Sequence, residues 1–425
     1  MGSVGDAISL LAKGEENDFQ ALGVQLLQAM TTYTQALKDE NLPPPSLRVS
    51  PLPDARVKSS QGKAAKQAII EISQLICAAT MDPELNLLIS SLQFHFCSCL
   101  KVAIDLRVHN FIPLDGAVAL SQLAKLVGAE EALLVRIMRV LVNKHVFRQP
   151  QPGYYAHTRM SSVLLKPNTH DLLCHRLEEV FRSASREADS LAAGGYREPK
   201  RGLNYGFNLA FDTDKNFWNY ISEDDPSRGQ RFGRAMHAVN INSTDTVPRL
   251  YPFDSLVVDG GLIVDVGGGE GQVAKGILNY YPNSGLRCIV QDGLVKKSTA
   301  AGPAVEMQPH DFFDPQPVKG AAAYFFRHIF HDWPDNACVT ILRQTAKAMD
   351  KHKSRILICD QVMQDDSPTE ASILYDIDMM SLFGGKERTL GEWKRLVASA
   401  DAGLDITNVA YNPECEAAIL ELRLQ

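Results

Sequence analysis

The segment FFRHIFHDWPD, residues 325–335, gathers ionisable side chains at the end of an apolar run. The run predicts a buried strand, and polar residues just past such a strand lie at the sheet edge where ligands bind. His331 follows the strand and is therefore the better candidate for a general base at that edge. His328 lies within the strand or at its end, which favours local packing or hydrogen bonding.

The same residues could instead hold a metal ion, because two histidines and Asp332 stand close together. A metal site requires further donors at a supporting spacing. The sequence offers no additional His, Cys or acid at such a spacing, and we therefore expect no metal.

A glycine-rich turn occupies the segment LIVDVGGGEGQVAKGIL, residues 262–278, which predicts a strand, a turn and a helix. Gly267, Gly269 and Gly271 allow a ligand to approach the backbone closely. The dinucleotide fingerprint G-x-G-x-x-G is not met, because Gln272 stands where its third glycine would fall. Asp265 ends the strand instead, and a carboxylate there could face a cationic, amino-acid-bearing cofactor.

Further acids follow the next two predicted strands. Asp292 ends LRCIVQD and suits a ribose diol. In HDFFD, Asp311 could bind an adenine amino group and Phe312 could pack on the ring. Acids at three successive strand ends predict an adenosyl ligand without phosphates.

The order of elements predicts four regions. We expect an N-terminal helix and Pro-rich linker over 1–60, with helix at 7–39 and a break at 41–54. A winged-helix module follows over 61–165, then a helical connector over 166–245. From 246 to 425, short apolar strands alternate with helices, which predicts an α/β doubly wound parallel sheet with an antiparallel hairpin at one edge.

A winged helix raises the alternative of DNA binding. Its second helix, LLVRIMRVLVNK, is apolar over most of its surface, whereas a recognition helix must present polar side chains to base edges. We therefore interpret the module as one for packing or dimerisation.

Composition limits the remaining classes. The 425 residues carry a net charge of -7, which disfavours a nucleic-acid partner. No uninterrupted apolar run is long enough to span a membrane, and the N-terminus lacks the features of a secretory signal. The eight cysteines are scattered without a CxxC pair, which is typical of a reducing compartment. We expect a cytoplasmic protein with neither a nucleic-acid nor a membrane partner.

The motifs VDVGGGEG, HDWPD and GGKERT, in this order and spacing, resemble the S-adenosylmethionine-dependent O-methyltransferases. The similarity is to the plant caffeate and flavonoid type and to relatives in fungal polyketide clusters. It extends over about residues 80–425 and implies S-adenosylmethionine as cofactor, a Rossmann-like methyltransferase sheet, and a winged-helix domain that dimerises the chain.

The resemblance also implies site residues. Gly267, Asp292, Asp311 and Phe312 would contact the cofactor, and Arg327 stands where the family usually has lysine. His331 would be the general base, with Asp360 and Glu387 as the carboxylates that orient its ring. The acceptor would be walled by aromatic, thioether and acidic side chains from two regions: Trp218, Phe232, Met236, Asp378 and Met379.

These expectations describe a homodimeric O-methyltransferase acting on a phenolic or enolic hydroxyl of a small aromatic or polyketide metabolite. Histidine and phenol differ in pKa by about 3.5 units, so neighbouring carboxylates would help an imidazole take the proton. Two alternatives stay open. One is an enzyme of this fold that catalyses dehydration or pericyclic chemistry, and the other is a regulator that binds the cofactor as a signal.

Overall fold

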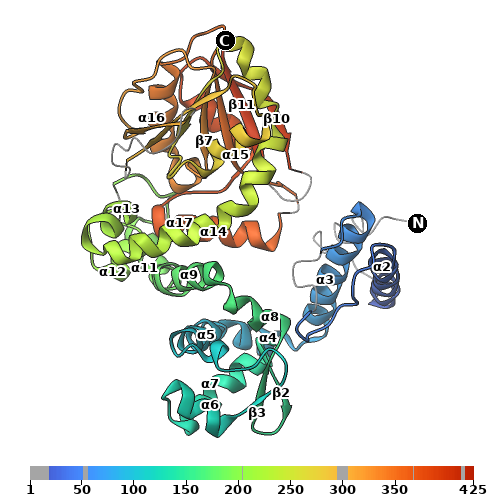
Figure 1. The fold of residues 1–425 in the computed structure, drawn as a ribbon. Coiled ribbons are helices and arrows are strands. Elements are labelled where there is room, and N and C mark those ends of the chain that lie inside the picture. The colour runs from blue at the N-terminus through green and yellow to red at the C-terminus, as the bar shows by residue number, and fades with distance from the viewer. Residues whose placement is uncertain (1–18, 51–55, 203, 294–304, 367, 413–416) are drawn as a thin grey trace. The chain divides into compact units, whose positions relative to one another are not determined.

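The computed structural model describes residues 19–50, 56–202, 204–293, 305–366, 368–412 and 417–425. The chain divides into two compact units, with the boundary between His170 and Asp171 (Figure 1). The expected helix at 7–39 is observed from Phe19 onward, and its first part lies outside the described residues.

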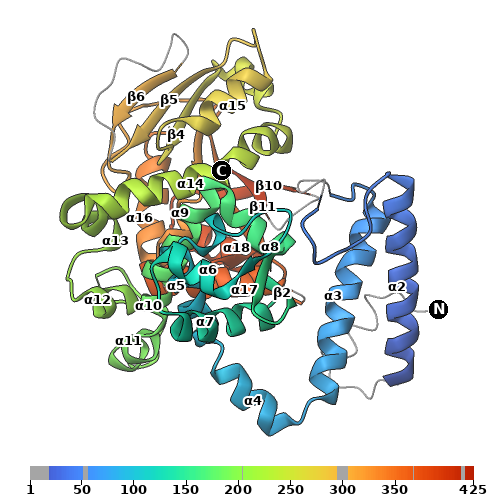
Figure 2. The same ribbon diagram turned by 60° about the horizontal axis from the view of Figure 1, so that its bottom comes forward.

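The first unit begins with two long helices, α2 (Phe19–Asp39) and α3 (Ser60–Thr80), which lie side by side (Figure 2). Small and aliphatic side chains at helical spacing form the seam between them, a pattern that allows close approach. The buried residues of this seam are Leu22, Ala29, Ala68 and Ile72.

Helices α4 (Pro83–Ser91) and α5 (Phe94–Asp105) follow. By length and composition alone, the 23 residues Pro83–Asp105 could cross a membrane. The sequence analysis did not expect any segment of this kind. Scattered Ser, Gln and His residues interrupt the run without making it polar. In the structure Leu92 and Gln93 form a turn that divides the segment into the two helices.

The winged-helix module is confirmed. Helices α6 (Leu120–Val127) and α7 (Glu131–Asn143) precede the hairpin of β2 (Phe147–Gln151) and β3 (Tyr154–His157), which β1 (Val118–Ala119) joins. In α7, Leu134, Met138 and Leu141 are buried, so the apolar face packs inside the module.

The next helices lead from the winged-helix module into the second unit. They are α8 (Arg159–Ser162), α9 (Pro167–His175), α10 (Phe181–Ala184), α11 (Glu187–Ala193), α12 (Gly206–Phe211), α13 (Phe217–Asn219) and α14 (Pro226–Leu250). Two π-helical turns, Arg176–Val180 and Tyr220–Asp224, interrupt the regular spacing. Such turns shift side chains by one position and often occur at functional sites.

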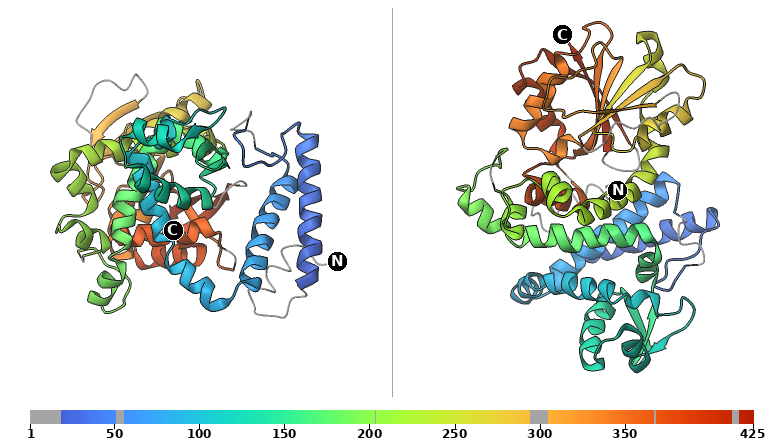
Figure 3. Two further views of the ribbon diagram at one scale, coloured as in Figure 1. Left: turned by 90° about the horizontal axis from the view of Figure 1, so that it is seen from below. Right: turned by 60° about the vertical axis from the view of Figure 1, so that its left-hand side comes forward.

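The second unit is built on a twisted sheet with helices on both faces (Figure 3). Its strands run in the order β10-β11-β8-β7-β4-β5-β6. Their bounds are β4 (Leu262–Val266), β5 (Arg287–Asp292), β6 (Val305–Pro309), β7 (Ala323–Arg327), β8 (Arg355–Met363), β10 (Leu404–Tyr411) and β11 (Ala417–Leu424). Neighbours from β6 to β8 are parallel, whereas β11 pairs antiparallel with both β8 and β10.

Alternation along the strands builds two cores. On β7, Tyr324 and Phe326 face a cluster with α16 (Asp335–Ala346) and α18 (Leu390–Ser399). Ala323 and Phe325 face the opposite cluster with α14 and α15 (Gln272–Tyr280). Because β4 and β7 are neighbours whose chains continue to opposite sides of the sheet, loops after both strands meet at one ligand-binding edge.

The predicted fold class and the edge hairpin are confirmed. The sequence analysis implied the strand before Asp311, β6, without placing it, and it did not predict β1 or β9 (Arg388–Thr389). Strand β6 is an edge strand with the polar sequence VEMQP, and β9 is a two-residue extension beside β8, so neither shows an apolar run.

Replacing Phe325 by alanine should test the central core. The side chain is fully buried in the middle of the sheet, so the cavity should lower the free energy of unfolding by about 4 kcal/mol. Guanidinium denaturation followed by circular dichroism measures this change. Tyr196→Ala is the control, because that side chain is 80% exposed and should change stability by less than about 0.5 kcal/mol. Equal midpoints for the two variants would contradict the assigned core.

Candidate active site

The glycine turn after β4 has the geometry that the sequence predicted. Gly267, Gly269 and Gly271 adopt φ values of 73°, 56° and 76°, which favour glycine. A side chain at Gly267 would overlap Ile329, whereas the space beside Gly269 is open. The turn therefore packs against the segment after β7 on one side and offers backbone to a ligand on the other.

Acidic side chains surround this turn. Asp265 is buried, and its Oδ2 has no hydrogen-bond partner among the described residues. Burial raises the pKa of Asp265 to about 7, although nearby Arg327 opposes the rise. Asp292 Oδ2 accepts a hydrogen bond from the Gly269 N–H at 3.0 Å. A buried carboxylate beside open glycine backbone fits a cationic ligand better than a pyrophosphate.

Phe312 and Asp311 occupy the next loop. Phe312 is half-buried, and its ring lies 3.9 Å from the position that a Gly267 side chain would take, so it borders the glycine turn. Asp311 is exposed, and its Oδ1 accepts the Phe313 N–H at 2.9 Å. Together the turn, the acids and this ring suit an adenosyl ligand that carries an amino acid.

His331 is held by Glu387 from a segment 56 residues away. Its Nδ1 lies 2.8 Å from Glu387 Oε1, which leaves Nε2 for other partners. Burial disfavours the imidazolium, but Glu387, Asp332 and Asp360 outweigh burial and raise the pKa of His331 to about 10. The ring is therefore oriented by one carboxylate and kept charged by three.

Asp360 lies near this ring without a hydrogen bond to it. The residue is buried on β8, and neither carboxylate oxygen has a hydrogen-bond partner among the described residues. Burial raises the pKa of Asp360 to about 6, although His331 opposes the rise. The structure thus brings the three predicted catalytic residues together, but only Glu387 contacts the imidazole directly.

His328 has the local role expected of it. Its backbone takes a left-handed φ of 51° where the chain leaves β7. Burial, followed by the charges of Arg327 and His331, holds the pKa of His328 well below its usual range. A neutral ring is therefore expected beside the cationic one. Within the described ranges, no group of three or more His, Cys, Asp or Glu side chains is arranged for a metal ion.

Sequence reasoning missed Arg388, which fixes the loop that carries the base. Its guanidinium is fully buried and donates to the carbonyls of Phe330 and Trp333 at 3.0 and 2.9 Å, and to Asp335 Oδ1 at 2.8 Å. An arginine in GGKERT looks like a solvated charge. The only available signal was its place beside Glu387.

The two glycines of GGKERT explain how Glu387 reaches the ring. Gly384 has a φ of 63° and ends α17 (Glu370–Phe383). A side chain on Gly385 would overlap the His331 carbonyl, and the next N–H, that of Lys386, donates to this carbonyl at 2.9 Å. A capping box of Thr389 and Glu392 then starts α18.

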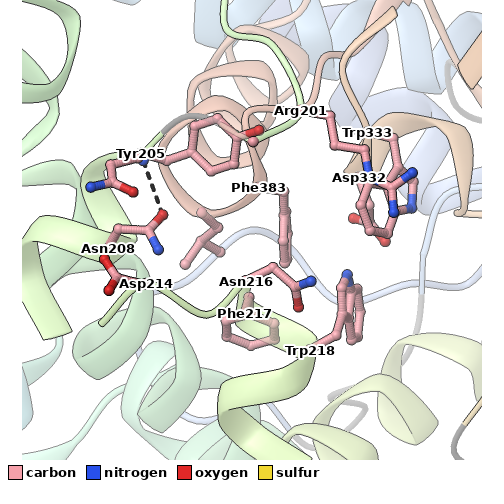
Figure 4. A pocket seen from close by; sticks show the side chains of 13 residues that line it. Arg201, Tyr205, Asn208, Asp214, Asn216, Phe217, Trp218, Asp332, Trp333 and Phe383 are labelled. Carbon is pink, nitrogen blue, oxygen red and sulfur yellow. Dashed lines mark hydrogen bonds between the residues drawn. The ribbon is translucent and has the colours of Figure 1, made fainter. Parts of the chain in front are cut away.

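A pocket of about 200 Å³ opens beside the base (Figure 4). The buried residues of its lining are mostly aromatic, and Asp332 and Trp333 also line it. The rim carries exposed polar residues. The aromatic lining is Tyr205, Phe217, Trp218, Trp333 and Phe383.

The predicted acceptor wall is partly gathered here. Trp218 lines the pocket and stacks on Phe383 with an interplanar angle of 8°. Phe232 and Met379 pack in the same cluster behind that lining, and Met236 is half-buried one helical turn after Phe232. Asp378 forms an ion pair with Arg176, so its carboxylate already has a partner within the protein.

Known proteins are similar to this chain in sequence. Residues 197–403 match the O-methyltransferase domain family, and residues 89–167 match the O-methyltransferase dimerisation domain family. O-methyltransferase penK from Penicillium thymicola is 70% identical over 426 residues, and the match covers 100% of both chains.

Solved structures share the fold. OxaC in complex with SAH and oxaline has a TM-score of 0.76 at 24% identity, covering 95% of this chain and 100% of that chain. A structure described as a pericyclic reaction enzyme has a TM-score of 0.72 at 24% identity, covering 93% and 98%.

The fold and the site define an α/β enzyme with a place for an adenosyl ligand beside a buried histidine and carboxylates. The family matches and the relative from Penicillium identify that class more closely. The chain belongs to the family of S-adenosylmethionine-dependent O-methyltransferases. The predicted family, enzyme class and cofactor are thereby confirmed.

Asp360→Asn should show how burial of the Asp360 carboxylate affects the free energy of unfolding. The folded-state pKa of Asp360 is raised from 3.8 to about 6, so the folded protein binds the proton more tightly than the unfolded chain. Wild type therefore loses stability as pH rises through this window, and an uncharged asparagine does not. The variant's free energy of unfolding, relative to wild type, should rise by about 3 kcal/mol between pH 4 and 7.

Urea denaturation at several pH values gives this difference. Asp366→Asn, at an exposed carboxylate, is the matched control and should show no such trend. A flat difference for Asp360→Asn would mean that its carboxylate is not desolvated in the folded protein.

Gly385→Ala should disturb the base through the backbone. The added methyl overlaps the His331 carbonyl, so the free energy of unfolding should fall by about 2 kcal/mol or more, and activity should fall with it. Gly391→Ala is the control, because a side chain there meets neighbours only at ordinary contact distances of 3.5 Å or more. Thermal denaturation and a methyl-transfer assay compare the pair, and equal behaviour would contradict the close approach.

Proposed function

We propose that this enzyme methylates a phenolic or enolic hydroxyl of a small aromatic or polyketide metabolite, with His331 as general base. The observation that carries the proposal is the hydrogen bond between His331 Nδ1 and Glu387. It directs Nε2 toward the side of Asp332, which lines the aromatic pocket.

The proton chemistry suits a phenol. A phenol has a pKa near 10, so transfer to an ordinary imidazole would cost about 5 kcal/mol. Because the carboxylates raise the pKa of His331 to about 10, the two groups match. Once the ring is neutral, the acceptor's proton can move to Nε2 while the acceptor oxygen forms its new bond.

We assign the cofactor contacts to the glycine turn and its neighbours. When bound, S-adenosylmethionine supplies an electrophilic methyl group on a sulfonium. The turn at Gly267 and Gly269 would bind the amino-acid end together with Asp265, and Asp292 would bind the ribose. Asp311 and Phe312 would hold the adenine. Arg327 would neutralise Asp265 and Asp360, both of which act on its charge.

The helical connector over 166–245 would form the acceptor wall together with α17. Trp218 and Phe383 present parallel rings, which favour a flat substrate. Phe232, Met236 and Met379 would support this wall. Asp378 would act on the acceptor wall indirectly, through its ion pair with Arg176. The Arg176 guanidinium also lies 4.9 Å from the centre of the Tyr375 ring.

A homodimer in the cytoplasm is the proposed working form. The dimerisation-domain match supports a second copy as partner. Residues on α4 just before it, such as Leu85, Leu87 and Leu88, are exposed. No disulfide joins the seven described cysteines, which suits a reducing compartment.

Pericyclic or dehydration chemistry is the second candidate. One specific observation favours it: the similarity in fold to a pericyclic reaction enzyme. The presence of His331 with its carboxylates argues for proton removal and methyl transfer.

His331→Asn should decide between the two. With labelled S-adenosylmethionine and a panel of phenolic polyketides, label transfer should fall about 100- to 10,000-fold, because the base is lost. Binding of S-adenosylhomocysteine, measured by calorimetry, should persist. His352→Asn, at an exposed histidine, is the control and should keep full activity.

Mass spectrometry of the same reactions detects rearranged products. If wild type consumes an acceptor without transferring label, the enzyme performs non-methylating chemistry and the assigned role of His331 is wrong.

A further inference from the structure

The two ring nitrogens of His331 face different carboxylates. Nδ1 lies 2.8 Å from Glu387 Oε1, and Nε2 lies 3.5 Å from Asp332 Oδ1. An acceptor hydroxyl can use only Nε2, because Glu387 occupies the other nitrogen. Any hydroxyl that reaches this base therefore arrives beside Asp332.

Asp332 is built into the site. It ends a short 3-10 turn, Phe330–Asp332, and its side chain is 9% exposed. It lines the pocket (Figure 4), and it follows the base directly in the chain. Arg388 fixes the backbone on both sides through the carbonyls of Phe330 and Trp333. The carboxylate is therefore held next to the atom where a proton must arrive.

A charged imidazole poses a problem that Asp332 can solve. Around neutral pH the surrounding carboxylates keep a proton on both nitrogens of His331, so Nε2 has no lone pair to offer. That proton must leave before the ring can accept another. Asp332 is the carboxylate beside Nε2, whereas Glu387 lies at Nδ1 and Asp360 makes no hydrogen bond to the ring.

The titratable and charged groups around the pair come from three segments. Arg327 ends β7 and His328 follows it, and Asp360 belongs to β8. Glu387 and Arg388 approach from the segment that enters β9. Burial raises the pKa of Asp332 to about 7, and His331 opposes that rise. A carboxylate with this balance can hold a proton at neutral pH.

We propose that Asp332 is the terminal proton acceptor of the reaction, so that His331 and Asp332 act as one base. The proton on Nε2 moves to Asp332 Oδ1, and the acceptor's hydroxyl proton moves to Nε2. The acceptor O–H bond breaks, an Oδ1–H bond forms, and the electron pair stays on the acceptor oxygen as the nucleophile. The inference rests on the proposed methyl transfer to a hydroxyl.

Asp332→Asn should remove proton uptake while keeping the side-chain shape. The test compares catechol, which is un-ionised at neutral pH, with the more acidic 4-nitrocatechol, which is largely ionised there. The variant should lose at least about tenfold more turnover with catechol than with 4-nitrocatechol. Asp332→Glu, which retains a carboxylate, should recover part of the catechol activity.

A second readout follows the proton without turnover. With S-adenosylhomocysteine present, catechol is titrated into each protein at about pH 8, where the Asp332 carboxylate can accept a proton and free catechol is un-ionised. Its ultraviolet absorbance should change to the phenolate form on binding wild type and should not change with Asp332→Asn. Asp314→Asn, at an exposed carboxylate, is the control and should behave as wild type in both assays.

The outcomes separate the two proposals. Equal losses with both catechols, no loss with either, or ionisation of the bound ligand by Asp332→Asn would overturn the role of Asp332 and leave methyl transfer intact. If wild type transfers no label to either catechol or to any phenol in the panel, the proposed function fails, and the inference fails with it.

Discussion

The bond between His331 and Glu387 is the constraint on which the rest of the site depends. A buried imidazolium is costly unless carboxylates accompany it, and each buried carboxylate is costly without the cation. The pair therefore forms only when the loop after β7 and the loop after α17 fold against each other. The separation of 56 residues makes this a tertiary contact, and Arg388 secures it through backbone carbonyls that flank the base.

The same loop also limits the cofactor site. Ile329, two residues before the base, packs where a side chain on Gly267 would lie. Phe312 borders the same glycine and lies against Trp333 with ring centres 5.9 Å apart. Movement of the loop after β7 would thus disturb both the glycine turn and the base. The proposed sites of the methyl donor and of the proton acceptor therefore share the loop after β7.

Much of this was predictable because it follows from local pattern. Apolar strands alternating with helices predicted the sheet, and the glycines predicted a turn whose backbone a ligand can approach closely. Strand β6 was implied before Asp311 but not placed, because an edge strand needs no apolar run. The π-helical turn at Arg176–Val180 was missed because no sequence period marks it.

Side-chain partnerships were harder to predict because they depend on distance in the fold. Asp360 and Glu387 were expected to play equal roles toward His331, yet only Glu387 bonds to the ring. Asp332 entered the sequence analysis only as a possible metal ligand. The sequence analysis did not single out Arg388. Each of these roles depends on which atom of His331 or its backbone lies nearby, and spacing along the chain does not contain that information.

The arrangement also explains why several acids surround one histidine. A single carboxylate at Nδ1 would orient the ring, but it would leave the departing proton on Nε2. A second acid at Nε2 gives that proton a place to go, and Asp360 adds negative charge that favours the cation without competing for a nitrogen. Because burial separates these groups from water, their mutual charges act at close to full strength. In the proposed mechanism, orientation, proton storage and charge stabilisation are thus divided among Glu387, Asp332 and Asp360.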